Sequence, residues 1–328
     1  MTKRNIVLLA GGNSSEREIA LQSAAQVAEA FDKERYNVWL VDLCGRKFIY
    51  RNGESEYYMD LNDFSLTVEG EKIVFDYAYI MIHGTPGEDG HLQGYLEMMG
   101  VPFSSCDMTS SVITFDKVTT KRAVADTGVK LAKGMLLREE DWIAPDAIVA
   151  ELGLPLFVKP NASGSSCGVT KVKSAEELPE AIFKAFDESP EVLIEECIVG
   201  REMACGVLVT ADKEYLFPIT EIVAKNEFFD YEAKYTAGMS DEITPADITP
   251  EIADRLHEMT LAAYKACRCK GLARVDFIVT AEGDPYMIEI NTIPGMSAGS
   301  IVPKQIRAAG MTMTEVLTLV IEDALCNQ

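Results

Sequence analysis

The stretch Ala273–Asn291, "ARVDFIVTAEGDPYMIEIN", alternates apolar and polar side chains on either side of Glu282-Gly283. Such alternation is typical of a strand with one buried face, and a Gly-containing turn between two such runs predicts an antiparallel hairpin. A turn made of these two residues places Asp276 opposite Glu289 on one face of the sheet. Like charges directly opposite each other repel, so a positively charged partner is needed to offset the repulsion between these two carboxylates.

The same register places Arg274 opposite Asn291, on the face that carries Asp276. A divalent cation between the two carboxylates converts their repulsion into binding, and Asp, Glu and Asn supply the hard oxygen ligands that suit Mg²⁺. The alternative interpretation is that these polar side chains only form the solvent-facing side of the hairpin. The loop that follows, "NTIPGMSAGSIVP" (residues 291–303), favours the metal site because its small residues leave backbone amides exposed.

A second stretch, Phe157–Val172, "FVKPNASGSSCGVTKV", interrupts an apolar run with a polar loop. Lys159 lies on the strand before the loop, and the loop holds Ser165 and Ser166 among glycines. Backbone amides in such a loop can surround a polyphosphate, although a plain polar turn is the commoner meaning of such a string. Combined with the metal site, the loop and its lysine predict an ATP site, to which Lys117 and Lys234 are further candidate phosphate ligands.

Composition excludes several other classes of protein. The 328 residues predict two or three domains, and 30 basic against 52 acidic residues give a formal charge of −22, which argues against nucleic-acid binding. Eight cysteines form no Cys-x-x-Cys pair, and three histidines are too few for a His-rich zinc site. Without a membrane-length apolar run or a credible signal peptide, we predict a reduced, cytoplasmic protein without membrane partners.

The order of apolar segments predicts three domains of α/β and α+β class. A buried strand, a Gly loop and a helix in residues 5–31 begin an open parallel α/β domain, residues 1–105, where ligands gather beyond the strand ends. Residues 106–200 are expected to form a small α+β domain, in which two strands fold over the Ser/Gly loop. Residues 201–328 are expected to form a second α+β domain that contains the hairpin.

The chain resembles the D-alanine–D-alanine ligases of the ATP-grasp superfamily over essentially its whole length. The matching segments occur in the family's order: "LLAGGNSSERE", "HGTPGEDGHLQGYLE", "DKVTTK", "VKPNASGSSCGV", "LIEECIVGRE", "DYEAKYTAG" and "RVDFIVTAEGDPYMIEINTIPGMSAGSIVPK". The resemblance implies an ATP-grasp fold whose two α+β domains clamp ATP. It implies ATP-dependent ligation of two D-alanines through an acyl phosphate, for peptidoglycan precursors, by a homodimer.

The resemblance also assigns roles to residues at the matching positions. Those expected to bind ATP are Lys117, Lys159, Ser166, Glu195, Glu196, Cys197, Ile198, Glu202 and Lys234. Those expected to bind two Mg²⁺ ions, which Mn²⁺ can replace, are Asp276, Glu289 and Asn291. Glu16, with Ser165 and Tyr235 hydrogen-bonded to it, is expected to anchor the first D-alanine and to close a lid at residues 226–242, with His83 nearby. Ser300 and Ile301 match the second D-alanine's pocket, and Arg274 and the Gly295 amide match the oxyanion stabilisers.

Two departures from the family pattern concern the substrates. Ala20 stands where many members carry serine, and Gly299 replaces a bulkier polar residue near the second-substrate pocket. D-Serine and D-lactate are therefore alternative acceptors, although "EAKY" (residues 232–235) favours D-alanine.

Two other classes explain parts of the sequence. An NAD-dependent dehydrogenase would account for the opening strand, Gly loop and helix, but it needs a Gly-x-Gly-x-x-Gly motif, which is absent. An exported binding protein would account for an acidic α/β chain, but it needs a signal peptide. Release of ADP in response to D-alanine distinguishes the ligase from both.

Overall fold

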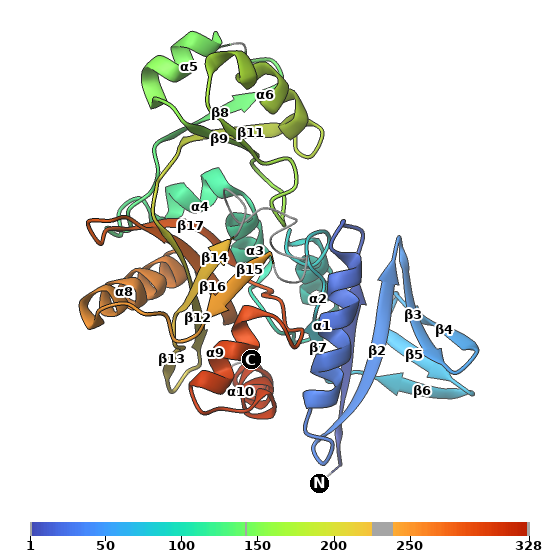
Figure 1. Cartoon of the computed structure of the whole chain (residues 1–328). Coiled ribbons are helices and arrows are strands. Elements are labelled where there is room, and N and C mark those ends of the chain that lie inside the picture. Colours follow the sequence, from blue (N-terminus) through green and yellow to red (C-terminus); the bar gives the residue numbers. More distant parts are fainter. Residues whose placement is uncertain (1, 142, 225–238, 327–328) are drawn as a thin grey trace.

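The computed structural model describes residues 2–141, 143–224 and 239–326, and three β-sheets organise this part of the chain (Figure 1). The first sheet has the order β6-β5-β4-β3-β2-β1-β7. Its strands are β1 (Arg4–Gly11), β2 (Tyr36–Cys44), β3 (Lys47–Asn52), β4 (Ser55–Asp60), β5 (Ser65–Val68), β6 (Glu71–Val74) and β7 (Tyr77–Ile80). β1 pairs in parallel with β2 and β7, as predicted, whereas β3–β6 add antiparallel strands that the sequence analysis did not include.

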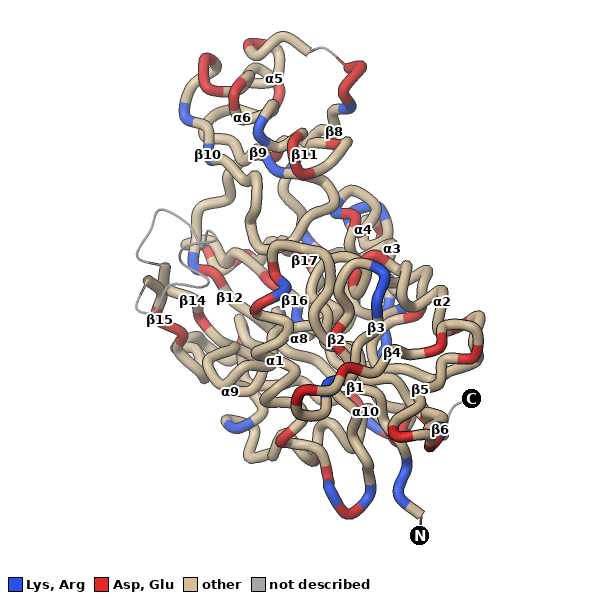
Figure 2. Tube along the Cα trace, turned by 90° about the vertical axis from the view of Figure 1, so that its right-hand side faces the viewer, with Lys and Arg blue, Asp and Glu red and all other residues tan. Residues whose placement is uncertain are grey.

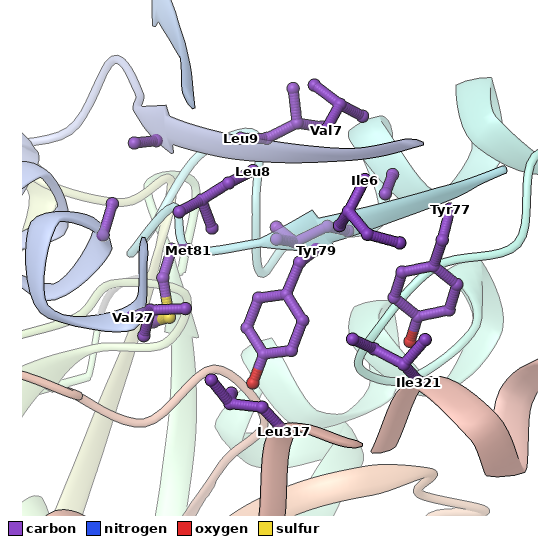
Figure 3. Close-up of a cluster of buried hydrophobic side chains, with 14 of the residues drawn as sticks. Ile6, Val7, Leu8, Leu9, Val27, Tyr77, Tyr79, Met81, Leu317 and Ile321 are labelled. Atoms are coloured by element: carbon purple, nitrogen blue, oxygen red, sulfur yellow. The ribbon is translucent and has the colours of Figure 1, made fainter. Parts of the chain in front are cut away.

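A hydrophobic core joins the first sheet to the end of the chain. α1 (Arg17–Ala30) and α10 (Met313–Cys326) both pack on it, and Val27, Tyr79 and Leu317 meet inside (Figure 3). Each fully buried aliphatic side chain of this kind contributes about 1.5–3 kcal/mol. The first strand is therefore stabilised by the last helix.

The N-terminus of α1 is held against β2 by one buried ion pair. Asp42 on β2 is 7% exposed, and Arg17 Nη2 donates to both of its carboxylate oxygens at 2.7 and 2.8 Å. Arg17 Nη1 also donates to the Leu43 carbonyl at 2.7 Å. Because Glu16 directly precedes Arg17, these contacts fix the backbone that presents the Glu16 carboxylate.

The second sheet, order β10-β9-β11-β8, stands apart from the other two sheets in Figure 1. Its strands are β8 (Gly134–Arg138), β9 (Leu156–Pro160), β10 (Thr170–Val172) and β11 (Glu191–Glu196). Its helical elements are α5 (Pro145–Leu152), the 3₁₀ turn η1 (Ala175–Glu177) and α6 (Leu178–Phe186). Leu178, Ala181 and Ala185 recur at helical spacing on α6 and bury that face against the sheet.

The third sheet has the order β15-β14-β12-β16-β17, with β13 paired to β12. Its strands are β12 (Arg201–Val209), β13 (Glu214–Leu216), β14 (Thr220–Ala224), β15 (Ser240–Ile243), β16 (Gly271–Val279) and β17 (Pro285–Asn291). The remaining helices are α2 (His91–Met99), α3 (Met108–Phe115), α4 (Lys117–Val124), α8 (Pro250–Ala266) and α9 (Ile301–Ala308). Boundaries at 105/106 and 200/201 fall between sheets, and we retain them as proposed domain limits.

In the hairpin β16–β17, Asp276 faces Glu289 as predicted, but the turn and the strand register differ from those predicted. The tight turn is one residue longer than predicted, because Thr280 pairs with Asp284 across it. A β-bulge next to Asp276 then shifts the register by one residue in the opposite sense. The two differences cancel, so the carboxylates still face each other.

Charged residues of both signs are distributed along the described chain. Figure 2 shows acidic and basic segments interspersed along the described chain, without a broad basic face in that view. Within residues 2–141, 143–224 and 239–326, every helix is too short or too polar to cross a bilayer.

Candidate functional site

Two adjoining cavities lie where the three sheets approach one another. The first, of about 320 Å³, is lined from the first sheet's side, the Ser/Gly loop, the β16–β17 hairpin and α9. The second, of about 450 Å³, lies between the second and third sheets. Both are lined by Lys117, Ser163, Gly164, Ile288 and Glu289, so the two cavities form one continuous cleft.

The Ser/Gly loop reaches the first cavity through Ser165. Ser165 and Ser166 adopt left-handed backbone conformations, with φ of 52° and 57°, which fold the loop sharply toward the cleft. The Ser165 hydroxyl donates to the Glu16 carboxylate, as the sequence analysis expected. Ser166 faces the second cavity instead, so the one loop contributes to both.

The lysines expected to bind phosphate lie at the junction and in the second cavity. Lys117 begins α4; its ammonium donates to the Ser163 carbonyl at 2.8 Å and lies 4.0 Å from a Glu289 carboxylate oxygen. Lys159 on β9 forms an ion pair with Glu195 on the neighbouring strand β11. Alternate residues of β9 and β11 point into the cleft. The Lys159 and Glu195 side chains therefore both reach it.

Glu195 is more deeply involved in ion pairs than the sequence analysis expected. Its carboxylate, 7% exposed, lies between the Lys159 ammonium and that of Lys121 on α4. Burial alone would raise the pKa of Glu195, but the two ammonium groups hold it below its ordinary value. Sequence reasoning missed Lys121, although its place four residues after Lys117 puts both on one face of α4.

The rest of the expected ATP segment lines the second cavity. Glu196, Cys197, Ile198 and Glu202 all border it, together with apolar side chains from the third sheet. Glu196 also accepts a hydrogen bond from the Lys133 backbone N–H at 2.7 Å, which fixes the end of β11. These positions make a mixed polar and apolar slot beside the lysines.

The hairpin brings the expected metal ligands together. Asp276 is 5% exposed, and the Asn291 amide donates to it at 3.0 Å. Arg274 donates two hydrogen bonds of 2.8 Å to the same carboxylate. The donor set of Asp276, Glu289 and Asn291 is made of hard oxygens on adjoining strands, and it fits Mg²⁺ by its chemistry. Only two of the three are acidic, and among the described residues no group of three His, Cys, Asp or Glu side chains forms a metal cluster.

The buried His83 and the half-buried Glu88 form one wall of the first cavity. The His83 Nδ1 atom lies 2.9 Å from the Ile293 carbonyl, and burial lowers the pKa of His83, which keeps the ring neutral. Glu88 accepts a hydrogen bond of 2.7 Å from the Gly84 N–H. Burial, and then the nearby Glu16 carboxylate, raise the pKa of Glu88 to about 8. Sequence reasoning missed Glu88; the loop "GTPGEDG" before α2 was its only signal.

The far side of the first cavity is formed by the loop after β17. Gly295, Ser300 and Ile301 all line it, and Ser300 is the N-cap residue of α9. The Ser300 and Ser297 hydroxyls are 2.8 Å apart, which fixes the loop against the helix start. Lys234 and Tyr235, with most of the expected lid, lie outside the described residues.

Several solved structures that share this architecture are ligases. The chain matches the VanG D-Ala:D-Ser ligase from Enterococcus faecalis with a TM-score of 0.87 and 31% identity, covering 98% of this chain and 100% of that one. It matches the D-alanine--D-alanine ligase from Bacillus anthracis with a TM-score of 0.81 and 33% identity, covering 98% of each chain. The same Bacillus anthracis enzyme complexed with ATP gives a TM-score of 0.77 at 30% identity, over 98% of this chain and 97% of that one. The predicted α/β and α+β ATP-grasp fold is confirmed.

Sequence comparison narrows the class to one family. Profiles of the D-ala D-ala ligase N-terminus and C-terminus match residues 5–106 and 123–322. The D-alanine--D-alanine ligase of Phocaeicola vulgatus is 47% identical over 322 residues, which cover 98% of this chain and 99% of that protein. That of Parabacteroides distasonis is 47% identical over 328 residues, covering 99% of each. This chain belongs to the D-alanine–D-alanine ligase family.

Proposed function

We propose that this chain joins two D-alanine molecules into D-alanyl-D-alanine for peptidoglycan precursors, with conversion of ATP to ADP and phosphate. The observation that carries the proposal is the continuous cleft. One end holds the Glu16–Ser165 pair, the other holds Lys159 beside the β11 slot, and Lys117 and Glu289 lie at the junction. A substrate carboxylate at the junction would meet the terminal phosphate of a nucleotide in the second cavity.

The first step activates a carboxylate, which is a poor acyl donor because oxide would have to leave. Transfer of the terminal phosphoryl group of ATP gives an acyl phosphate, whose phosphate leaves readily. Lys117 and Lys159 would position the phosphates and offset their charge, and positioning accounts for most of such catalysis. Glu16 would hold the ammonium of the first D-alanine. Asp276, Glu289 and Asn291 would hold Mg²⁺, or Mn²⁺ in its place, which neutralises phosphoryl charge when bound.

In the second step, the uncharged amine of the second D-alanine attacks the acyl carbonyl and forms a tetrahedral oxyanion, which collapses to the dipeptide with loss of phosphate and of a proton from the amine. Arg274 and the Gly295 N–H would stabilise that charge, and loss of one such donor typically lowers the rate by about 10²–10³. Ser300 and Ile301 would hold the second D-alanine at the start of α9. The neutral His83 would contribute hydrogen bonding at the first substrate without adding charge. We also propose that residues 226–242 exclude water from the acyl phosphate, with Tyr235 linked to Glu16.

The test is ADP release followed in a coupled assay on the purified chain. We expect ADP release only when D-alanine is present, with formation of the dipeptide confirmed by mass spectrometry. A panel of D-alanine, D-serine and D-lactate as acceptors tests the two alternative acceptors, of which D-serine is the one named for the Enterococcus faecalis structure. ATP consumption that ignores D-alanine would refute the proposal.

Two further parts of the proposal concern the state of the protein. A homodimer in the cytoplasm is the arrangement that we propose. Light scattering after size-exclusion chromatography measures the mass directly, and a mass near that of one 36.1 kDa chain would refute the dimer.

A further inference from the structure

The first cavity is more acidic than its proposed substrates require. Two D-alanines bring two carboxylates and two amino groups, one of which Glu16 would hold, yet four carboxyl side chains line the cavity against two permanent cations. The carboxyl groups belong to Glu16, Glu88, Glu242 and Glu289, and the cations belong to Lys117 and Arg274. Any unneutralised carboxylate among the four repels a substrate carboxylate nearby.

Three of the four carboxyl groups are accounted for by contacts already described. Glu16 accepts from Ser165, and its charge suits the ammonium of a substrate. Glu289 faces Lys117 across the junction. Glu88 accepts from the Gly84 N–H, and its pKa of about 8 keeps its proton near neutral pH. Glu242 is the last residue of the proposed lid but has no assigned contact with either substrate, so its charge needs a separate explanation.

Glu242 lies on β15 and is paired with a lysine from α9. The Lys304 ammonium is 2.8 Å from the Glu242 Oε2 atom, with side chains 33% and 15% exposed. α9 is the helix that begins at Ile301, and Lys304 follows one turn later on it. The ion pair therefore lies beside the part of the cavity where Ser300 and Ile301 would hold the second D-alanine.

The position of α9 does not depend on this ion pair. Ile301 packs with Ala204 of β12 and Ile222 of β14 in a small buried cluster. Gln305, fully buried, donates its side-chain amide to the Ala204 carbonyl at 2.8 Å. Packing and a buried hydrogen bond thus hold the helix, and Lys304 contributes its charge.

We infer that Lys304 determines the specificity of the cavity for an acceptor that bears a carboxylate, by neutralising Glu242 and holding it aside. Lys304 acts through Glu242 and is a positioning residue. The inference rests on the proposed function and adds to it the requirement that recognition of the acceptor's carboxylate depends on this pair. Without the lysine, the Glu242 charge faces the acceptor carboxylate.

The test compares two acceptors in Lys304→Met. We expect the KM for D-alanine as acceptor to rise about fivefold to tenfold, where tenfold corresponds to about 1.4 kcal/mol. The KM values for ATP and for D-alanine as donor should stay unchanged. With D-alaninamide, an acceptor that lacks the carboxylate, product measured by mass spectrometry should form equally well in the variant and the wild type. The effect on D-alanine should shrink at high salt because the site is partly exposed.

Two more variants separate charge from structure. Lys304→Arg keeps the charge and should retain the wild-type acceptor KM. Adding Glu242→Gln to Lys304→Met removes the unpaired carboxylate and should restore the wild-type acceptor KM. The matched control is Lys265→Met, which breaks the 2.6 Å pair with Glu214 on the same sheet, away from both cavities, and should leave all KM values unchanged.

An unchanged acceptor KM in Lys304→Met would overturn the inference, as would equal losses for D-alanine and D-alaninamide. Failure of the Glu242→Gln addition to restore the KM would overturn it as well. These outcomes leave the proposed function intact, because the wild type still forms the dipeptide. A wild type that forms no dipeptide would overturn the proposed function, and this inference with it.

Discussion

Replacing Glu88 by glutamine should change how stability depends on pH. The pKa of Glu88 is raised from 4.5 to about 8, and an acid with a raised pKa keeps its proton in the native state after the unfolded chain has lost it. The native state therefore binds more protons between pH 4.5 and 8, so the free energy of unfolding falls as pH rises through that window. Fully ionised, the site costs up to about 5 kcal/mol.

Urea denaturation of both proteins at pH 5, 7 and 9, followed by circular dichroism, measures this cost. Glutamine cannot titrate, and its carbonyl can still accept from the Gly84 N–H. We expect Glu88→Gln to gain stability relative to the wild type as pH rises from 5 to 9. Burial of His83 acts in the opposite direction at low pH, but it does so in both proteins and cancels.

The matched control for this experiment is Glu54→Gln, at an exposed position in the β3–β4 turn. Its stability should follow that of the wild type at every pH. If Glu88→Gln also follows the wild type in parallel, the Glu88 carboxyl is not held protonated by its surroundings, and the account of this wall of the cavity is wrong.

Four other substitutions test the remaining parts of the site. Glu195→Gln leaves Lys121 and Lys159 without their shared carboxylate. It should lower the free energy of unfolding by about 3 kcal/mol and raise the KM for ATP. An unaltered KM would contradict the role of Glu195 in positioning the two lysines. Arg274→Ala, like Glu289→Ala, should abolish ligation while the circular dichroism spectrum stays native, and near-normal turnover in either would break the assignment. Asp42→Asn weakens the bidentate pair with Arg17 and should lower the free energy of unfolding, measured in urea, by about 1–3 kcal/mol. It should also raise the KM for D-alanine as donor. A change in stability alone would mean that the pair does not position the donor site.

The fold class could be predicted because its evidence is local. Strand alternation in residues 273–291 and the Gly loop after β1 depend on neighbours in the sequence. The order of apolar segments predicted three domains, and those domain limits stay a prediction. The strands β3–β6 could not be predicted in the same way, because short polar strands with frequent turns give weak periodicity. The facing of Asp276 and Glu289 was predicted correctly only because a longer turn and a bulge offset each other.

The contacts within the site were harder to predict than its members. Glu195 lies in a segment expected to bind ATP, but its pairing with Lys121 needs a side chain of α4 to reach β11, which no sequence pattern reports. The raised pKa of Glu88 arises from burial and from the proximity of Glu16, which is 72 positions away in the sequence. Such properties depend on tertiary packing, which hydrophobic periodicity and motif spacing do not encode.

The contact between the first strand and the last helix has a consequence for dissecting the protein. The Glu322 carboxylate forms an ion pair with the Arg4 guanidinium at 3.0 Å and accepts a hydrogen bond from the Tyr36 hydroxyl at 2.7 Å. These polar contacts add to the apolar contacts of Leu317. The fragment 1–105 made by itself would expose that apolar face, so it should aggregate unless residues 313–326 are supplied as a peptide. Conversely, Arg4 near the start of the described chain pairs with Glu322 near its end, so a circular permutant with the ends joined by a glycine linker and opened at the exposed Gly53 turn should still fold.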